Sequence, residues 1–468
     1  MKKKHTTKAN IECEEYYFSL TRGHIVALIM APVLAVAVYF LMLAQGSLIA
    51  GALSITVFAA TLWITEALPL PVTAVLIPVG LATVGVFKIS DAYVSFGSPV
   101  LFLVLGGYAL AVAVEANKVD RWIAQHILSL AGSHTIGLLV AFMLTSALLS
   151  MLISNTATTA LLLPVALGIL AKQKIDNNLS RLLLLGVAYG ASIGGVATLT
   201  GSAPNAIAAG LLDINFLQWI SYGLPVSITM LIVAIPILWW TYTPNTKHIK
   251  TSINQEKEKL TKDGRKTLFV TAITLFLWLF GPFITQLLSL SSALFSSASV
   301  AVLAVALLIL TGCVRWRTIE KGVHWGVLLL LGGGLTLGRG LTESGAADWL
   351  ANLLVSGVGD LPMLVLLLFL VGIGVFATEL ISNTAVTAKL APILAGVALQ
   401  LGLETSSLVI PVAIATSMAF MLPVATPPNA LVHASGHITQ HDMMKAGLRL
   451  NFAAIFVITL LFYFNLAG

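Results

Sequence analysis

One six-residue phrase occurs twice in this chain and constrains its fold more than any other feature. Leu-Ile-Ser-Asn-Thr-Ala occupies 152–157 and returns at 380–385. Each copy interrupts a long apolar run, where polar groups are costly to bury. A second small-residue break follows each copy, at 200–205 (TGSAPN) and at 425–429 (ATPPN). Two segments with the same pair of breaks predict a duplicated fold whose halves share one binding site.

The composition indicates a chain that lies largely within a lipid bilayer. Hydrophobic residues make up 58% of the 468 residues and charged residues only 9%, whereas a soluble domain carries about 25% charged residues. Apolar runs of roughly 20 residues recur, which is the length that a helix needs to cross the hydrocarbon core. The net charge of +6 is concentrated in short loops, so it bears on membrane orientation and does not indicate nucleic-acid binding.

The first 23 residues are polar and are interpreted as a cytoplasmic tail. The chain begins Met-Lys-Lys-Lys like a signal peptide, but Glu12, Glu14 and Glu15 precede the first apolar run and no small-residue cleavage site follows. The two cysteines, Cys13 and Cys313, are both expected on or near the cytoplasmic face. No disulfide framework is therefore predicted.

Hydrophobic periodicity predicts an all-α polytopic membrane protein. Two apolar segments, 135–172 and 361–400, are too long for one helix and contain the repeated phrase, so each is expected to enter the membrane and return as a re-entrant hairpin. Two amphipathic stretches, 118–132 and 345–357, are expected at the interface. About eleven crossings remain, at 24–43, 47–66, 71–88, 98–116, 181–212 (broken at 200–204), 222–243, 267–288, 292–313, 323–342, 406–436 (broken at 425–428) and 447–466.

The basic residues support this topology. With a cytoplasmic N-terminus and two hairpins, lysine and arginine gather in cytoplasmic loops, acidic residues dominate the external loops, and the C-terminus is external. The halves 47–243 and 267–466 then match element by element but begin on opposite sides, as in an inverted-topology repeat. The cytoplasmic basic residues would be Lys118, Arg121, Lys172, Lys174, Arg181, those of the linker 244–266, Arg315, Arg317, Lys321, Lys445 and Arg449.

The two hairpin tips and the two breaks are expected to meet near the middle of the bilayer. Broken helices in inverted repeats commonly surround substrate and ions at that depth. Helical arms after Thr156 and Thr384, and half-helices after Pro204 and Pro428, would direct four helix N-termini at one place. Their partial positive charge and free N–H groups favour an anion.

The same loops are also suited to cations. They contain no lysine or arginine, and their polar atoms are hydroxyl, amide and carbonyl oxygens, which suit a hard cation. Helix dipoles alone would not neutralise an anion with two carboxylates, so co-bound cations would supply the missing charge. An isolated serine or threonine in a membrane helix is more often a contact between helices than a ligand. Because the phrase is duplicated in inverted halves, we instead predict at least two cation sites.

The paired Ser-Asn-Thr tips, each followed by a small-x-Pro-Asn break, resemble the divalent anion/sodium symporter family, the relatives of the "I'm not dead yet" dicarboxylate transporters. The likeness extends from about 24 to 466. It implies a plasma-membrane homodimer in which a transport part moves like an elevator against a scaffold that forms the dimer interface. The parts would be a tail at 1–23, a scaffold at 24–133 and 267–357, a transport part at 134–243 and 358–468, a linker at 244–266, and connecting arms at 118–132 and 345–357.

The resemblance also implies ligand residues at specific positions of this sequence. The first sodium site would use Ser150, Ser154, Asn155 and the backbone of Gly201. The second would use Thr378, Ser382, Asn383 and the backbone of Ala425. The substrate carboxylates would contact Asn155, Thr156 and Ser202 from one half, and Asn383, Thr384, Thr426 and Pro427 from the other.

One lysine departs from the apolar pattern of the second hairpin. Lys389 occupies the place of Leu161 in the first half and would act as a built-in cation, favouring sodium-independent exchange, if it pointed at the tip. It lies six residues after Asn383, about 240° around a helix, so it is expected to point away from the tip. It is interpreted as a snorkelling or scaffold-facing lysine that pairs with Glu379. Three further charged residues near span ends are expected at the membrane interface, namely Glu66, Glu115 and Arg339.

The predicted function is sodium-coupled import of C4-dicarboxylates such as succinate, malate or fumarate. The alternatives with the same fold are a sodium-independent dicarboxylate exchanger and a citrate or sulfate symporter. An enzyme is not predicted, because it would need a nucleophile–base pair or a metal cluster, and only His433, His437 and His441 show i, i+4 spacing. The chain has no phosphate-binding loop of an ATP-driven pump, and a channel would not need duplicated ligands.

Overall fold

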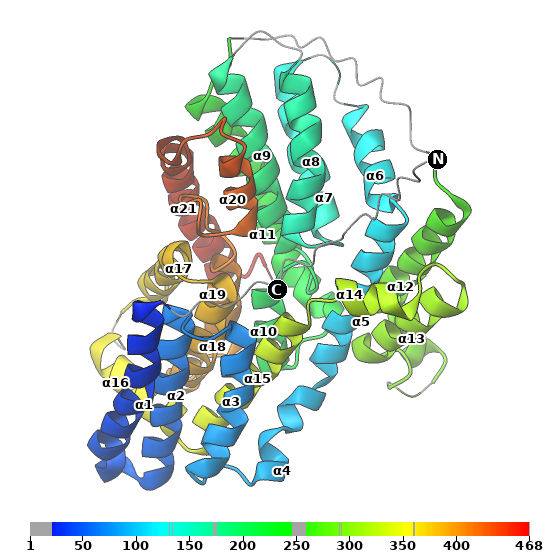
Figure 1. The fold of residues 1–468 in the computed structure, drawn as a ribbon. Coiled ribbons are helices and arrows are strands. Elements are labelled where there is room, and N and C mark those ends of the chain that lie inside the picture. The colour runs from blue at the N-terminus through cyan, green and yellow to red at the C-terminus, as the bar shows by residue number, and fades with distance from the viewer. Residues whose placement is uncertain are drawn as a thin grey trace, which may run out of the picture.

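A computed structural model describes residues 21–467 except 131, 133, 172–175, 246–258, 290, 292, 359 and 360. Most of the predicted tail, including Cys13, and much of the predicted linker lie outside the described residues. The described chain is helical throughout (Figure 1). Its helices are α1 Arg22–Met42, α2 Ser47–Thr65, α3 Leu70–Thr83, α4 Ile89–Ala92, α5 Pro99–Ala116, α6 Val119–Leu128, α7 Thr135–Ser150, α8 Asn155–Leu170, α9 Asn177–Gly195, α10 Ala203–Leu212, α11 Phe216–Thr241, α12 Lys262–Leu287, α13 Ser297–Leu310, α14 Trp316–Gly322, α15 Trp325–Glu343, α16 Ala346–Val358, α17 Met363–Leu380, α18 Asn383–Gln400, α19 Ser406–Ala415, α20 Pro427–Ala434 and α21 Gln440–Tyr463, with short 3-10 turns at Leu43–Gln45 and Val94–Gly97.

The described helices confirm the predicted all-α membrane fold. Eight of them are long and apolar enough to cross a bilayer, namely α1 with the turn after it, α2, α5, α11, α12, α15, α17 and α21. Six further apolar helices are shorter, α3, α7, α8, α10, α13 and α19. Four of these, α7, α8, α10 and α19, are arms of the hairpins or parts of the broken helices, where no single helix has to span the membrane. The inverted repeat and the number of crossings stay predictions.

The first repeated phrase joins two helices that pack against each other. α7 ends at Ser150 and α8 begins at Asn155. Ser154 caps α8, because its Oγ accepts a hydrogen bond from the backbone N–H of Ala157 at 3.1 Å. In the second hairpin α18 begins at Asn383, with Ser382 at the N-cap position. Both arms therefore begin at the asparagine of the phrase, earlier than the predicted start after the threonine.

The two broken helices are interrupted over longer stretches than predicted. The first break extends over 196–202, between α9 and α10, whereas the prediction was 200–204. The second extends over 416–426, between α19 and α20, whereas the prediction was 425–428. Proline and small residues mark only where the second half-helix starts in each case, so sequence reasoning placed the breaks too late.

Two asparagine side chains explain why the breaks can be so long. A carbonyl that loses its helical N–H partner inside a membrane protein needs another donor. The Nδ2 atoms of Asn205 and Asn429, both fully buried, supply this donor. Asn205 donates to the carbonyl oxygens of Gly195 (2.9 Å), Val196 (3.3 Å) and Thr198 (2.7 Å). Asn429 donates to those of Ala419 (3.1 Å) and Leu422 (3.1 Å).

Each hairpin packs against a half-helix from the other half of the chain. α8 contacts α20, and α18 contacts α10. Figure 1 shows the orange α20 beside the green α8 and α9, although these segments are far apart in sequence. These contacts between the two halves bring both tips and both breaks to the same place in the fold.

The remaining long helices pack around these segments in two sets. In the first set α2 packs against α1 and α3, and the sequence-distant α15 packs against α2 and α3. In the second set α5 packs against α12, α13 and α14. α15 also contacts α10 and α18, so it lies between the first set and the hairpin region. The predicted amphipathic stretches are the helices α6 and α16, which contact α7 and α18 respectively. The assignment of these sets to a scaffold and a mobile part stays a prediction.

Candidate functional site

A cavity of roughly 1120 Å³ lies where the two tips and the two breaks meet. It is lined by 154–157 and 381–384 from the tips, and by 200–204 and 424–428 from the breaks. All seven residues predicted to contact substrate line this one cavity: Asn155, Thr156, Ser202, Asn383, Thr384, Thr426 and Pro427. The structure therefore brings together residues that two halves of the sequence contribute separately.

Four helices begin at the wall of this cavity. They are α8, α10, α18 and α20, whose first residues or N-caps all line it. Thr426 caps α20 by accepting a hydrogen bond from the backbone N–H of Asn429 at 3.3 Å. Converging helix N-termini concentrate partial positive charge and free N–H donors, so the cavity is suited to an anion without any lysine or arginine in its loops.

Oxygen atoms gather behind the first tip, at the predicted first sodium site. The hydroxyl of Ser150, which is fully buried, donates a hydrogen bond to Oδ1 of Asn155. A Cβ at Gly201 would lie 2.5 Å from the carbonyl oxygen of Gly195 and 2.9 Å from that of Ser150. Only glycine fits there, so the backbone of Gly201 is held against the oxygens of the tip. Ser154 also lines the cavity.

A matching group of oxygens lies behind the second tip. The hydroxyl of Thr378 is within hydrogen-bonding distance of Oδ1 of Asn383 and of the carbonyl oxygen of Thr416, the latter at 2.7 Å. The hydroxyls of Thr387 and Thr416 are 2.7 Å apart, and both residues are buried. The other two predicted ligands of the second sodium site, Ser382 and Ala425, line the cavity.

The sequence did not identify Thr416 and Ser417 as site residues. The Oγ atoms of Ser202 and Ser417 lie 3.0 Å apart and join the two halves of the chain directly. Ser417 is 2% exposed, in the early part of the second break. Two adjacent hydroxyl residues that end the apolar run of α19 were a usable signal, but the break was predicted to begin only at 425.

The predicted ion pair between Lys389 and Glu379 is wrong. Glu379 is 4% exposed and its carboxylate accepts four hydrogen bonds instead. Oε1 accepts from the backbone N–H groups of Phe420 and Met421, both at 2.8 Å, and from Nδ2 of Asn451 at 2.7 Å. Oε2 accepts from the backbone N–H of Leu422 at 2.9 Å. The carboxylate is thus satisfied by the second break and by α21.

Lys389 lies away from the tips. It is not among the residues that line the cavity, as its predicted direction around α18 requires. Its Nζ atom is buried, and within the described part of the chain it has no hydrogen-bond partner. A built-in cation at the tip, which sodium-independent exchange would need, is therefore not supplied by this lysine.

The remaining wall of the cavity carries ionisable residues that the sequence had placed only at the membrane interface. Glu66, the C-cap of α2, and Glu115 near the end of α5 both line the cavity. Arg339, in contrast, forms an ion pair with Glu343 at 2.9 Å. Four further lining residues were not identified from sequence, because they come from distant helices: His24, Tyr108, Lys321 and His324.

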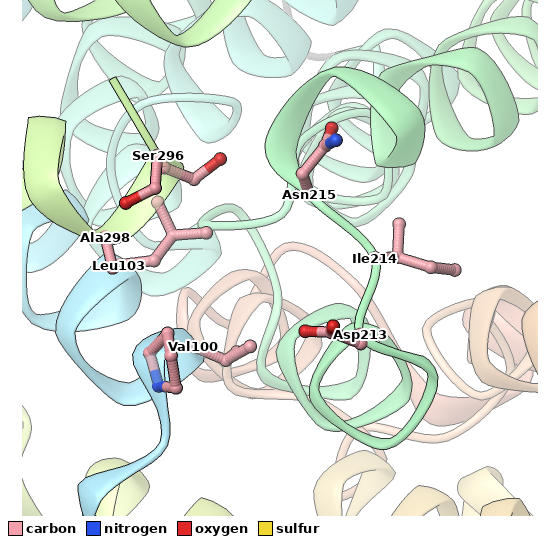
Figure 2. A pocket seen from close by; sticks show the side chains of 9 residues that line it. Val100, Leu103, Asp213, Ile214, Asn215, Ser296 and Ala298 are labelled. Atoms are coloured by element: carbon pink, nitrogen blue, oxygen red, sulfur yellow. The ribbon is translucent and has the colours of Figure 1, made fainter. Parts of the chain in front are cut away.

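A second, smaller cavity of roughly 250 Å³ lies at the other end of α5. Figure 2 shows Val100 and Leu103 of α5 facing Asp213 and Asn215, which connect α10 to α11. The large cavity instead contains Tyr108 and the end of α5. Since α5 has 18 residues and is therefore about 27 Å long, the two cavities lie near opposite ends of this helix.

The three histidines with helical spacing do not form a metal site with one another. Nδ1 of His433 lies 3.0 Å from the carbonyl oxygen of Ile438, which places its ring in a local turn. Among the residues that the structure describes, no group of three His, Cys, Asp or Glu side chains is arranged to hold a metal ion.

The chain is similar to described transporters over most of its length. A family model described as a citrate transporter matches residues 60–408. An uncharacterized transporter of Haemophilus influenzae is 39% identical over 88% of this chain and 90% of its own length. The sodium-dependent dicarboxylate transporter SdcS of Staphylococcus saprophyticus is 32% identical over 94% of this chain and 91% of its own.

Two solved structures share the fold at low sequence identity. The YdaH transporter of Alcanivorax borkumensis has a TM-score of 0.55 and 15% identity, over 80% of this chain and 87% of its own. MtrF of Neisseria gonorrhoeae, described as one of a class of antimetabolite efflux pumps, has a TM-score of 0.54 and 14% identity, over 80% and 83%. At these identities the likeness establishes the fold alone.

Proposed function

This chain belongs to the citrate transporter family, whose model matches residues 60–408, and we propose that it carries C4-dicarboxylates such as succinate, malate or fumarate into the cell together with sodium ions. It is a multi-pass membrane transporter of the citrate and dicarboxylate type. The observation that carries the proposal is the convergence of four helix N-termini and two groups of neutral oxygens on one cavity.

The charge balance of the site favours a dianion carried with cations. The four helix N-termini each offer a partial charge of about one half, but α7, α9, α17 and α19 end beside the same tips and breaks and bring partial negative charges of similar size. Neither tip contributes a full positive charge, and Lys321 in the cavity wall is accompanied by Glu66 and Glu115. Two substrate carboxylates would therefore remain under-neutralised in a low-dielectric site. Two sodium ions, one at Ser150, Asn155 and Gly201 and one at Thr378 and Asn383, would supply the missing charge. The relative SdcS is named as sodium-dependent, which supports this coupling.

Uptake into proteoliposomes tests the substrate and the ion together. We expect labelled succinate to accumulate when external sodium exceeds internal sodium, and to fall to background when choline replaces sodium. Excess malate and fumarate should compete, whereas sulfate should not. Equal uptake with sodium and with choline would favour the sodium-independent exchanger, and complete competition by citrate or sulfate alone would favour the corresponding symporter.

The distribution of basic residues supports an orientation with the N-terminus cytoplasmic and the C-terminus external. The large cavity includes Lys321 and lies toward the face where α2 and α5 end. The basic residues at the start of α9, at α14 and at the start of α21 belong to that same face in the proposed topology. The structure would then represent the state that is open to the cytoplasm. The homodimer implied by the family resemblance stays part of the proposal.

A glycine surface on α15 supports an elevator-type movement. A Cβ at Gly334 would lie 3.4 Å from Cβ of Ala388, and one at Gly338 would lie 3.2 Å from Leu211 and 3.3 Å from Pro392. The residues opposite belong to α10 and α18, which carry a break and a tip. A surface without side chains lets packed helices slide with little steric resistance, so we assign α15 to the fixed part and α10 and α18 to the moving part.

Substituting Gly338 by valine is expected to reduce uptake by at least tenfold, because the branched side chain fills the contact between α15 and the moving helices. An extra methyl group in a close-packed contact already costs about 1–3 kcal/mol of packing free energy. Sodium-dependent binding of succinate in detergent should persist. The matched control is Gly372→Val, since a Cβ at Gly372 would meet only Ile455 at 3.9 Å. Normal uptake by the Gly338 variant would contradict this sliding contact.

A further inference from the structure

We propose that a cluster of basic and aromatic residues at one corner of the molecule binds the phosphate headgroup of an anionic phospholipid. The corner lies where α9 begins, α11 ends and α21 begins. We call it the headgroup cluster, and its residues are Arg181, Trp240, Tyr242, Lys445 and Arg449. None of them lines the large cavity, and the inference does not depend on the transported substrate.

Aromatic rings hold the cations of this cluster in place. Arg181 and Lys445 both lie over the ring of Tyr242, with the guanidinium carbon and Nζ 5.9 Å from its centroid in each case. The guanidinium carbon of Arg449 lies 5.1 Å from the ring centroid of Trp240, and its Nη1 donates to Oγ1 of Thr241 at 2.8 Å. Cation–π contacts of this kind position a charge without neutralising it.

The cluster carries more positive than negative charge. Two carboxylates lie at this corner. Asp176, the N-cap of α9, accepts hydrogen bonds from the backbone N–H groups of Asn178, Leu179 and Asn245. The second is Asp442. Its Oδ1 forms an ion pair with Arg181 at 2.8 Å, and its Oδ2 accepts from the backbone and hydroxyl of Thr439. No ion pair in the described part of the chain joins Lys445 or Arg449 to a carboxylate. Three cations against two carboxylates leave a net +1, which Lys445 and Arg449 carry, with most of their N–H donors still available.

The position of the cluster points to a lipid rather than a soluble anion. α11 and α21 are both long enough to cross a membrane, so Trp240, at the end of α11 and 75% exposed, lies at the level where tryptophan anchors helices in the interface. A row of apolar side chains on α21, each 39–54% exposed, starts at the cluster and continues toward the other end of the helix. The row is Met444, Leu448, Phe452, Phe456 and Leu460.

These two rows of α21 lie side by side. Lys445 and Arg449 are four residues apart, as are the members of the apolar row, and residues at that spacing share one helix face. The basic pair is displaced from the apolar row by one residue, or about 100°. A phospholipid whose phosphate contacts Lys445 and Arg449 can therefore extend an acyl chain along Leu448 and Phe452. Basic pockets next to exposed apolar helix faces suit anionic lipid headgroups.

Mass spectrometry of retained lipid tests the proposal. The full chain would be reconstituted in vesicles of phosphatidylglycerol and phosphatidylethanolamine, extracted in mild detergent, and analysed for bound lipid. We expect the wild type to retain phosphatidylglycerol. The double variant Lys445→Gln with Arg449→Gln should bind this lipid roughly 30-fold more weakly, which is the effect of removing two cations from a membrane surface. The control, Arg315→Gln with Arg317→Gln, removes the same charge from exposed positions beside α14 and should retain the lipid.

Equal retention of phosphatidylglycerol by the wild type and both double variants would overturn the proposal. Displacement of the lipid by millimolar inorganic phosphate would also overturn it, because the ligand would then be a soluble anion. If the double variant does not fold, the single variant Lys445→Gln decides the question. The side chain of Lys445 is exposed and forms no hydrogen bond with the described residues, so its loss should weaken lipid binding without affecting folding.

Discussion

Replacing Asn155 or Asn383 by alanine is expected to abolish uptake while leaving the protein folded. Each asparagine is the first residue of a helical arm, lines the large cavity and receives a hydrogen bond at Oδ1 from the hydroxyl behind it, on Ser150 or Thr378. In the proposed function each side chain contacts both a sodium ion and a substrate carboxylate. Losing two contacts to charged groups, at about 1.5–3 kcal/mol each, lowers uptake by at least about 100-fold.

The measurement is initial uptake of labelled succinate into proteoliposomes with matched amounts of protein. Folding would be checked by gel-filtration profile and thermal unfolding in detergent, where both variants should resemble the wild type. The control is Asn352→Ala, which removes an exposed asparagine from α16. Normal uptake by either tip variant would count against the assignment of the site, and a misfolded variant would show instead that the side chain holds the tip together.

The tips and their meeting place were predictable because the signal is duplicated. Six identical residues in two apolar segments indicate two equivalent turns, and an inverted repeat brings equivalent elements together. Serine at both N-cap positions follows from the same six residues, and at the first tip Ser154 satisfies a free helix N–H, that of Ala157. For this reason all seven predicted substrate residues line one cavity, although their role as ligands is still a prediction.

The part of the cavity wall that lies outside the tips and the breaks could not be predicted in the same way. Glu66, Glu115, Tyr108 and Lys321 come from helices whose packing against the tips is set by tertiary contacts, and no local pattern records such contacts. The long breaks have the same cause. The carbonyls of Gly195, Val196 and Thr198 accept hydrogen bonds from the side-chain amide of Asn205, several residues further along, so proline and glycine alone do not reveal where the helix ends.

The error at Glu379 has an instructive physical basis. A charged residue in an apolar segment suggests a partner of opposite charge, and Lys389 was the cation in the same hairpin. A carboxylate, however, is also stabilised by several N–H donors, and the second break presents three backbone N–H groups in succession. The residue types of the break do not reveal these donors, because backbone N–H groups become free only where the helix is interrupted.

Replacing Glu379 by alanine is expected to lower the free energy of unfolding by at least about 3 kcal/mol, because four N–H donors in a buried region lose their acceptor and each unsatisfied donor costs about 1–3 kcal/mol. The donors belong to Phe420, Met421, Leu422 and Asn451. The carboxylate therefore connects α17 to the second break and to α21. Without it, the segment that contributes Thr426 to the cavity loses its hydrogen bonds to α17.

Glu379→Gln should have a smaller effect than alanine. The glutamine carbonyl oxygen can keep the three hydrogen bonds at Oε1, whereas its amide group would face the N–H of Leu422 and repel it. The control is Met151→Ala, since Met151 occupies the equivalent place before the first tip and is only half-buried. Its hydrogen bond with Thr198 uses the backbone oxygen, so truncation of the side chain leaves that bond in place. Thermal unfolding in detergent, followed by tryptophan fluorescence, gives the order of stability. If the alanine variants at 379 and 151 are equally stable, the carboxylate is not what holds the second break against α21.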